Sequence, residues 1–125
     1  MHLSAHSKRT IVLGATPNPQ RYAYMAVQRL ISYGHEVFPV GIRRGQVAGI
    51  DILNDFPAID QVDTVTLYLN PDHQRPYYDY ILGLTPNRII FNPGTENPEL
   101  MRMAQDRGIE VEVACTLVML SLGVY

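Results

Sequence analysis

The chain has 125 residues, of which 46% are hydrophobic and 18% charged, with a formal net charge of −2. This length and balance predict one globular domain and exclude a disordered chain. A net charge so close to zero creates no field that would attract nucleic acid or an anionic membrane surface, so neither partner is expected. No apolar run is long enough to span a membrane.

The single cysteine, Cys115, excludes an internal disulfide and a cysteine-rich zinc site. A lone thiol fits a reducing compartment, and we therefore expect a cytoplasmic protein. No two histidines have the spacing of metal ligands, so no metal is expected.

Residues 1–9 are polar and are predicted to form a flexible tail, which leaves residues 10–125 for the domain. The apolar run at 10–14 ends in glycine and is typical of a buried parallel strand. After turn residues at 16–21, apolar residues recur with helical spacing from Ala23 to Ile31. Gly34 is placed to end this helix.

A second strand is predicted at 36–40, where Pro39 lacks a donor and should lie near the strand end or interrupt the ladder. A basic loop with two glycines, Gly41-Ile-Arg-Arg-Gly45, follows. Residues 47–57 are ambiguous, since they could hold a short edge strand or an irregular connection.

The rest of the chain continues the alternation of strands and helices. Asn70-Pro71 and Asn97-Pro98 each supply an N-cap and a first-turn proline for a helix. Further strands are predicted at 62–69, 88–91 and 109–113, and a last short helix at 116–122.

Repeated strand–helix–strand units require parallel strands joined by right-handed crossovers. We therefore predict an α/β fold, a single doubly wound Rossmann-like domain with a mainly parallel sheet of about five strands. Ligands of such sheets bind beyond the carboxyl ends of the strands, where the strand order reverses. The loops at those ends are 14–22, 41–45, 69–72, 92–97 and 114–116.

The first of these loops, Gly14 to Arg21, has features of a phosphate site. Gly14 permits close backbone approach, the following helix start offers unpaired N–H groups, and Arg21 presents a fork of donors. Only one glycine is present, whereas the dinucleotide fingerprint needs three, and the Walker lysine is absent. A tight turn with a solvated arginine would give the same residues.

The run Gly14-Ala-Thr-Pro-Asn-Pro-Gln-Arg21 and the run Gly34-His-Glu-Val-Phe-Pro-Val40 resemble the small stand-alone CoA-binding protein family. That family is related to the CoA-binding domain of the succinyl-CoA synthetase α subunit. The resemblance continues through Val62-Asp63, Gly94-Thr-Glu-Asn97 and Cys115, and it covers residues 10–122.

The resemblance implies a nucleotide-binding role for particular positions, with coenzyme A as the ligand. Gly14, Ala15 and Thr16 would line the phosphates, with Arg21 close to them. Arg43 would meet a ribose phosphate or the adenine edge. The loop residues that would flank the adenosine are Tyr68, Asn70 and Pro71, and those beside the pantetheine arm are Asn92, Pro93 and Gly94.

Two departures from the family pattern bear on the ligand. Many members have an arginine at the position of Leu69 and an Asp-Arg pair where this chain has Val113-Ala114. The leading hypothesis is non-catalytic binding of coenzyme A, an acyl-CoA or a related adenine nucleotide. The alternatives are a sensor of an NAD-type dinucleotide and a protein-interaction module with a degenerate nucleotide site.

Three further residues or segments carry expectations. Cys115 is interpreted as a small structural hydrophobe, although its place at the end of the last strand borders the expected cleft. His35, which opens the second predicted strand, is expected to be a surface or cap residue and not a ligand-binding residue. The apolar segment 117–125 could cover a contact in a homodimer.

Overall fold

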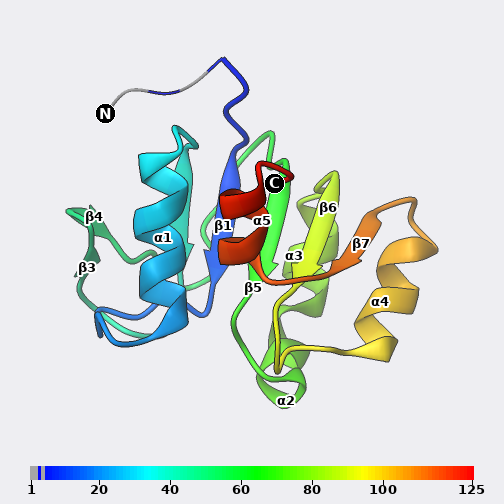
Figure 1. Ribbon diagram of the computed structural model, residues 1–125. Helices are drawn as coiled ribbons and strands as arrows, with labels where there is room; N and C mark the ends of the chain where they lie inside the picture. The colour runs from blue at the N-terminus through cyan, green and yellow to red at the C-terminus, as the bar shows by residue number, and fades with distance from the viewer. Residues whose placement is uncertain (1–2, 4) are drawn as a thin grey trace.

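The computed structural model describes residues 3 and 5–125 and has a five-stranded parallel sheet at its centre (Figure 1). The strands are β1 (Thr10–Leu13), β2 (Val37–Val40), β5 (Thr64–Leu67), β6 (Arg88–Phe91) and β7 (Glu110–Val113). Their order is β2-β1-β5-β6-β7, so the order reverses between β1 and β5. The predicted doubly wound, Rossmann-like α/β fold is confirmed.

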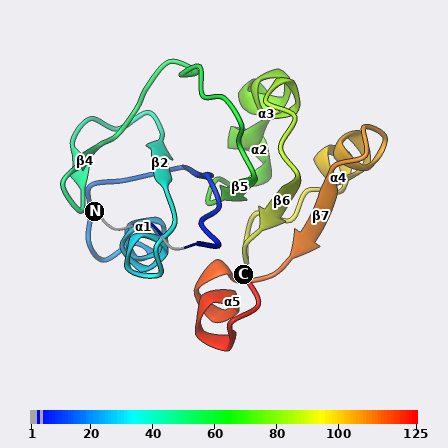
Figure 2. The same ribbon diagram turned by 90° about the horizontal axis from the view of Figure 1, so that it is seen from above.

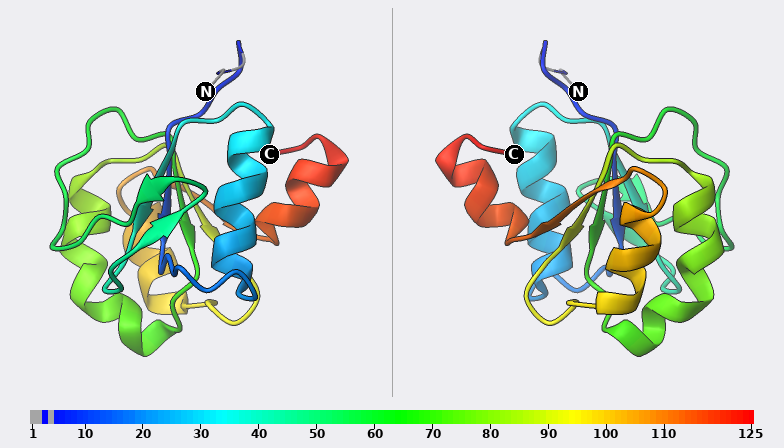
Figure 3. Two further views of the ribbon diagram at one scale, coloured as in Figure 1. Left: turned by 90° about the vertical axis from the view of Figure 1, so that its left-hand side faces the viewer. Right: turned by 90° about the vertical axis from the view of Figure 1, so that its right-hand side faces the viewer.

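Helices cover both faces of this sheet (Figures 2 and 3). On one face lie α1 (Tyr22–Ser32) and α5 (Thr116–Leu122), which pack against each other. The other face carries α2 (Pro71–Gln74), the short 3₁₀ helix η1 (Arg75–Tyr77), α3 (Tyr78–Gly83) and α4 (Pro98–Gln105).

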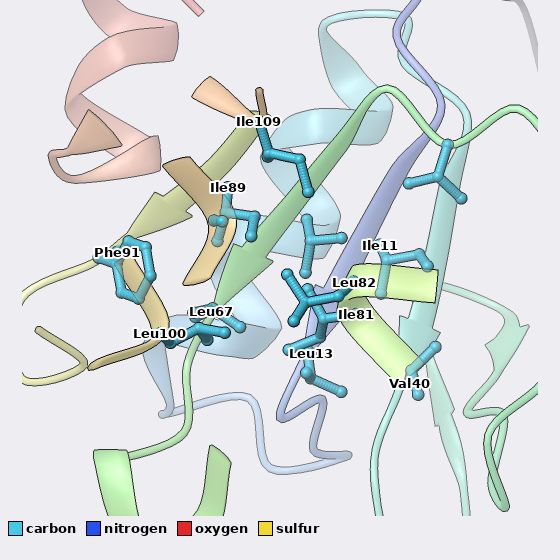
Figure 4. Close-up of a cluster of buried hydrophobic side chains, with 13 residues drawn as sticks. Ile11, Leu13, Val40, Leu67, Ile81, Leu82, Ile89, Phe91, Leu100 and Ile109 are labelled. Carbon is cyan, nitrogen blue, oxygen red and sulfur yellow. The ribbon is translucent and has the colours of Figure 1, made fainter. Parts of the chain in front are cut away.

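Buried hydrophobic side chains form two clusters, one on each face of the sheet. They follow from the alternation of side chains along each strand. Ile11 and Leu13 face α3 and α4, within a cluster that includes Leu82 and Leu100 (Figure 4). Val12, between them in the sequence, packs with side chains of α1 and α5 on the opposite face. Because both faces are covered, every residue of β1, β5 and β6 is buried, the polar Thr64 and Thr66 of β5 included.

Two predicted segments are divided more finely than the sequence indicated. The helix that begins after Asn70 is split into α2, η1 and α3 at Pro76, which has no N–H to donate to the preceding turn. The ambiguous stretch after Gly45 forms an antiparallel hairpin of β3 (Gln46–Val47) and β4 (Ile50–Asp51), separate from the main sheet.

The prediction of a flexible tail at residues 1–9 falls partly on residues 1, 2 and 4, which lie outside the described residues. Within this segment, Arg9 Nη1 lies 2.7 Å from Glu36 Oε1 and Nη2 lies 3.1 Å from Asp60 Oδ1. Lys8 Nζ donates to the Tyr125 carbonyl at 2.8 Å. In the part of the chain that the structure describes, no helix combines the length and apolar character needed to cross a membrane.

The expectation that His35 lies on the surface is wrong, because its side chain is buried. Its Nδ1 accepts a hydrogen bond from the backbone N–H of Lys8, and its ring meets the Tyr125 ring edge-on at 4.8 Å. Arg88 is buried nearby, with its guanidinium carbon 4.3 Å from the centre of the Tyr125 ring. This cluster lies at the amino ends of the strands, opposite the predicted ligand site.

Candidate functional site

Three loops meet at the carboxyl ends of β1, β2 and β5, where the strand order reverses. Gly14 has φ +102°, and a Cβ at this position would stand 3.0 Å from the Tyr68 carbonyl carbon. A Cβ on Gly41 would stand 2.8 Å from the Ala15 carbonyl oxygen. These two close approaches require glycine and bring the three loops into direct backbone contact.

The loop between β1 and α1 is ordered by its own side chains. Thr16 Oγ1 accepts from the backbone N–H of Asn18 at 3.2 Å, and Asn18 Oδ1 accepts from that of Gln20 at 3.0 Å. Pro17 and Pro19 restrict the backbone further. These internal contacts give the loop a defined shape.

Backbone donors at this loop are left free. Within residues 3 and 5–125, no acceptor meets the N–H groups of Thr16, Tyr22 or Ala23. The first turn of α1 has neither an acidic residue nor a side-chain cap. The positive end of the helix dipole and these N–H groups therefore point to an anion as the natural occupant.

Exposed arginines surround the same loops. Arg21, Arg43 and Arg44 are exposed, and none of them forms an ion pair with another described residue. The side-chain amide of Asn54 donates to the carbonyls of Gly41 and Arg43, which anchors the arginine-bearing loop. This corner of the domain thus carries uncompensated positive charge on an ordered backbone.

On the β5 side, the predicted residues differ in what their side chains do. The hydroxyl of Tyr68 is buried and has no hydrogen-bond partner in the described chain. Burial, followed by the nearby Cys115, raises the pKa of Tyr68, while the hydroxyls of Thr116 and Thr66 act in the opposite direction. Asn70 is exposed, and its Oδ1 accepts from the His73 N–H to cap α2, whose first residue is Pro71.

Asn92, at the end of β6, turns its side chain into the protein. Its Nδ2 donates to Thr66 Oγ1 at 2.6 Å and to the Leu67 carbonyl at 2.8 Å, and its Oδ1 accepts from the Thr116 N–H at 2.8 Å. The next two residues, Pro93 and Gly94, are exposed. The side chain of Asn92 therefore joins β5, β6 and α5, and only its neighbours face solvent.

A second buried network supports the same end of the sheet, and the sequence interpretation missed it. Gln74 Nε2 donates to the carbonyls of Leu69 and Thr95, both at 2.8 Å. Asn97 Nδ2 donates to Gln74 Oε1 at 2.9 Å, while its Oδ1 caps α4. The network holds the loops after β5 and β6 in fixed relation, which a ligand spanning both would require.

The structure thus places all the predicted site residues at the carboxyl end of the sheet. The site residues that follow β1, β2 and β5 lie in loops after three adjacent strands. The site residues that follow β6 lie one strand further along the sheet. Cys115 is half-buried at the start of α5. Across the described ranges, no group of three or more His, Cys, Asp and Glu side chains is placed to hold a metal ion.

Comparison with known proteins gives a family and a fold. A family model described as a CoA binding domain matches residues 8–121. A crystal structure of an uncharacterized protein is 55% identical, with a TM-score of 0.94, and the match covers 95% of this chain and 98% of that one. No curated protein matches the chain.

More distant structures share the fold alone. A protein designated cell-free ID.343 from Thermus thermophilus is 23% identical with a TM-score of 0.82, and the match covers 97% of this chain and 92% of that one. An NADPH-dependent glyoxylate/hydroxypyruvate reductase from Sinorhizobium meliloti is 12% identical with a TM-score of 0.61. That match covers 92% of this chain and 51% of the reductase.

Proposed function

The chain belongs to the CoA binding domain family, and from this premise we propose that it binds coenzyme A, an acyl-CoA or a related adenine nucleotide without catalysing a reaction on it. The observation that carries the proposal is the free N–H groups of Thr16, Tyr22 and Ala23 beside exposed arginines that have no ion-pair partner in the described chain. Phosphate groups match such donors in both charge and geometry.

In this proposal the diphosphate lies against the loop between β1 and α1. Gly14 and Ala15, whose N–H groups donate to the Val40 carbonyl, shape the loop that lines the phosphates, while Thr16 offers its N–H and Arg21 adds a charged donor. Arg43, on the loop anchored by Asn54, is positioned for the ribose phosphate or the adenine edge. A planar guanidinium can give a phosphate two parallel hydrogen bonds.

The remaining predicted residues receive the two ends of the ligand. Tyr68, Asn70 and Pro71 flank the adenosine, and Asn92, Pro93 and Gly94 lie along the pantetheine arm. The side-chain amide of Asn92 is already committed to three internal hydrogen bonds. We therefore infer that Asn92 supports this loop and that its exposed neighbours make the contacts.

Coenzyme A fits the loop after β2 better than an NAD-type dinucleotide does. Dinucleotide-binding Rossmann domains place an acidic residue near the end of the second strand for the ribose hydroxyls. Here the corresponding segment is Gly41-Ile42-Arg43, and its cation suits a ribose that carries a phosphate. The free thiol of Cys115 suits a reducing compartment, and we place this binding in the cytoplasm.

A non-catalytic role is supported by the surroundings of the only nucleophilic thiol. Cys115 forms no hydrogen bond with any histidine that the structure describes, so it lacks a base to activate it. His35 is buried at the amino ends of the strands, where it packs with Lys8 and Tyr125.

Thermal unfolding with matched concentrations of coenzyme A, dephospho-coenzyme A and NAD tests the proposal. A ligand present at roughly 100 times its dissociation constant stabilises the folded state by about 2.7 kcal/mol, which gives a clear rise in Tm. We expect the largest rise with coenzyme A and a smaller one without its 3′-phosphate. A larger rise with NAD would establish the dinucleotide alternative, and no rise with any of the three would favour the protein-interaction module.

A further inference from the structure

The outer face of α5 is apolar although it is exposed. No charged residue occurs from Val113 to Tyr125. Val118 and Leu122, one helical turn apart, are 52% and 70% exposed, and Val124 just beyond the helix is also exposed. A surface helix normally carries polar or charged residues on its outer side.

The inner side of the same helix is already used for packing. Thr116, Met119 and Leu120 are buried, and α5 contacts α1. Figure 2 shows α5 standing out from the sheet, with one side turned away from every other element. Val118, Leu122 and Val124 therefore form an unpartnered surface, which we call the α5 face.

Opposite charges lie on the two sides of the α5 face. Arg29, the only charged residue of α1, is exposed in the last turn of that helix. On the other side, β7 carries Glu110 and Glu112, and Glu112 lies 3.4 Å from Arg88, whose guanidinium covers the Tyr125 ring beyond α5. Neither Arg29 nor Glu110 has an ion-pair partner among residues 3 and 5–125.

We propose that a second copy of this chain covers the α5 face, in a homodimer whose two-fold axis runs along α5. Rotation about this axis places α1 of each copy opposite β7 of the other. Arg29 of one copy then faces Glu110 of the second copy, and the reverse contact forms at the same time. The uncharged centre brings no like charges together, and apolar centres are typical of homodimer interfaces.

This charge pattern selects a second copy as the occupant. A surface with a positive side, an apolar centre and a negative side is complementary to itself under that rotation. The other two-fold arrangement, with the axis across α5, would set Arg29 against Arg29 and Glu110 against Glu110. Like charges placed directly opposite each other are unfavourable.

Sedimentation equilibrium and light scattering measure the mass of the chain in solution. We expect twice the 14.1 kDa of one chain for the wild type and the single mass for Val118→Lys/Leu122→Lys. The matched control is Ile42→Lys, which charges an 82% exposed apolar residue outside the α5 face and should leave the dimer intact. A monomeric wild type, or dissociation by Ile42→Lys alone, would overturn the proposal.

Charge exchange tests the orientation, because each single change creates two repulsive contacts per dimer. We expect Arg29→Glu and Glu110→Arg each to raise the dimer dissociation constant roughly 10-fold or more. In the double variant the dissociation constant should return most of the way to the wild-type value. Circular dichroism of each variant establishes that the fold is retained. Additive weakening in the double variant would exclude the axis along α5.

Discussion

The imidazole Nδ1 of His35 accepts a hydrogen bond of 3.0 Å from the backbone N–H of Lys8, 27 positions earlier in the chain. An acceptor at Nδ1 must be unprotonated, so this contact requires the neutral ring. Burial lowers the pKa of His35 from its ordinary 6.5, with Lys8 and Arg88 acting in the same direction and Asp63 against them.

The stability of the protein should therefore fall as the pH falls through 6.5 toward the lower pKa of the folded state. Over that interval the unfolded chain binds more protons than the folded one, which favours unfolding. His35→Asn keeps an acceptor without a titrating group, and its free energy of unfolding should vary less with pH there. Denaturant unfolding at several pH values measures this, and equal slopes for both proteins would contradict it.

Asp63 provides a separate check on this interpretation because it acts in a different range. Burial raises the pKa of Asp63, but hydrogen bonds from Thr64 and Asn87 and the charges of Lys8 and Arg88 outweigh this effect. The pKa of Asp63 therefore lies below its ordinary value of 3.8. Its contribution is present above 3.8 and is lost only in stronger acid. Loss of stability just below pH 6.5 therefore cannot come from Asp63.

Gly41→Ala should destabilise the protein and weaken nucleotide binding together. The new Cβ would stand 2.8 Å from the Ala15 carbonyl oxygen, and forcing the loops apart costs about 1–3 kcal/mol. Gly83→Ala is the matched control, since its Cβ would meet nothing within 4 Å. Thermal unfolding and calorimetric titration with coenzyme A would show the difference, and similar behaviour of the two variants would argue against tight loop contact.

Asn92→Leu should lower the free energy of unfolding by several kcal/mol. It leaves the Thr116 N–H and the Leu67 carbonyl without their partner, and each buried unsatisfied group costs about 1–3 kcal/mol. Gln105→Ala, at an exposed position at the end of α4, should change stability by less than about 0.5 kcal/mol. Urea denaturation of both variants compares the two effects directly.

Arg43→Ala should weaken coenzyme A binding while leaving the fold intact. A charge-assisted hydrogen bond to phosphate contributes about 1.5–3 kcal/mol, which corresponds to roughly a 10- to 150-fold loss of affinity. Arg102→Ala removes an exposed arginine from α4, away from the loops, and serves as the control. Equal affinities of the two variants in calorimetry would return Arg43 to the role of a solvated loop residue.

Cys115→Ala should leave coenzyme A affinity within a few-fold of the wild type, since the thiol is assigned a structural role. Cys115 is half-buried at the start of α5, close to the buried Tyr68 hydroxyl. Thiol labelling of the native protein, with and without coenzyme A, supplies a second measurement. Rapid labelling that coenzyme A blocks would instead make Cys115 part of the ligand site.

The strands and the longer helices could be predicted because their patterns are local. Asn97-Pro98 starts α4 as expected, with Asn97 Oδ1 accepting from the Leu100 N–H. For the segment that forms the hairpin of β3 and β4, the sequence left open a short edge strand or an irregular connection, because strands of two residues show no measurable alternation. The position of Pro76 could have indicated the break between α2 and α3.

Burial of polar residues was harder to predict because it depends on distant partners. His35 is enclosed by Lys8 and by Tyr125, which lies at the other end of the chain. Gln74 bonds to the carbonyl of Thr95, 21 positions away, and nothing in its own neighbourhood signals that contact. The loop positions of the site followed from topology alone, whereas the network that supports them required the structure.

The two edge strands of the sheet, β2 and β7, affect whether the folded domain aggregates at high protein concentration. β2 contains Pro39, and its free side is met by the N–H of Leu53, which bonds to the Pro39 carbonyl at 2.8 Å. Strand addition at β7 would gather the carboxylates of Glu110 and Glu112 from both chains along one short ladder. Neither border of the sheet therefore offers a template for cross-β aggregation, and the folded domain should stay dispersed at concentrations where open sheets polymerise.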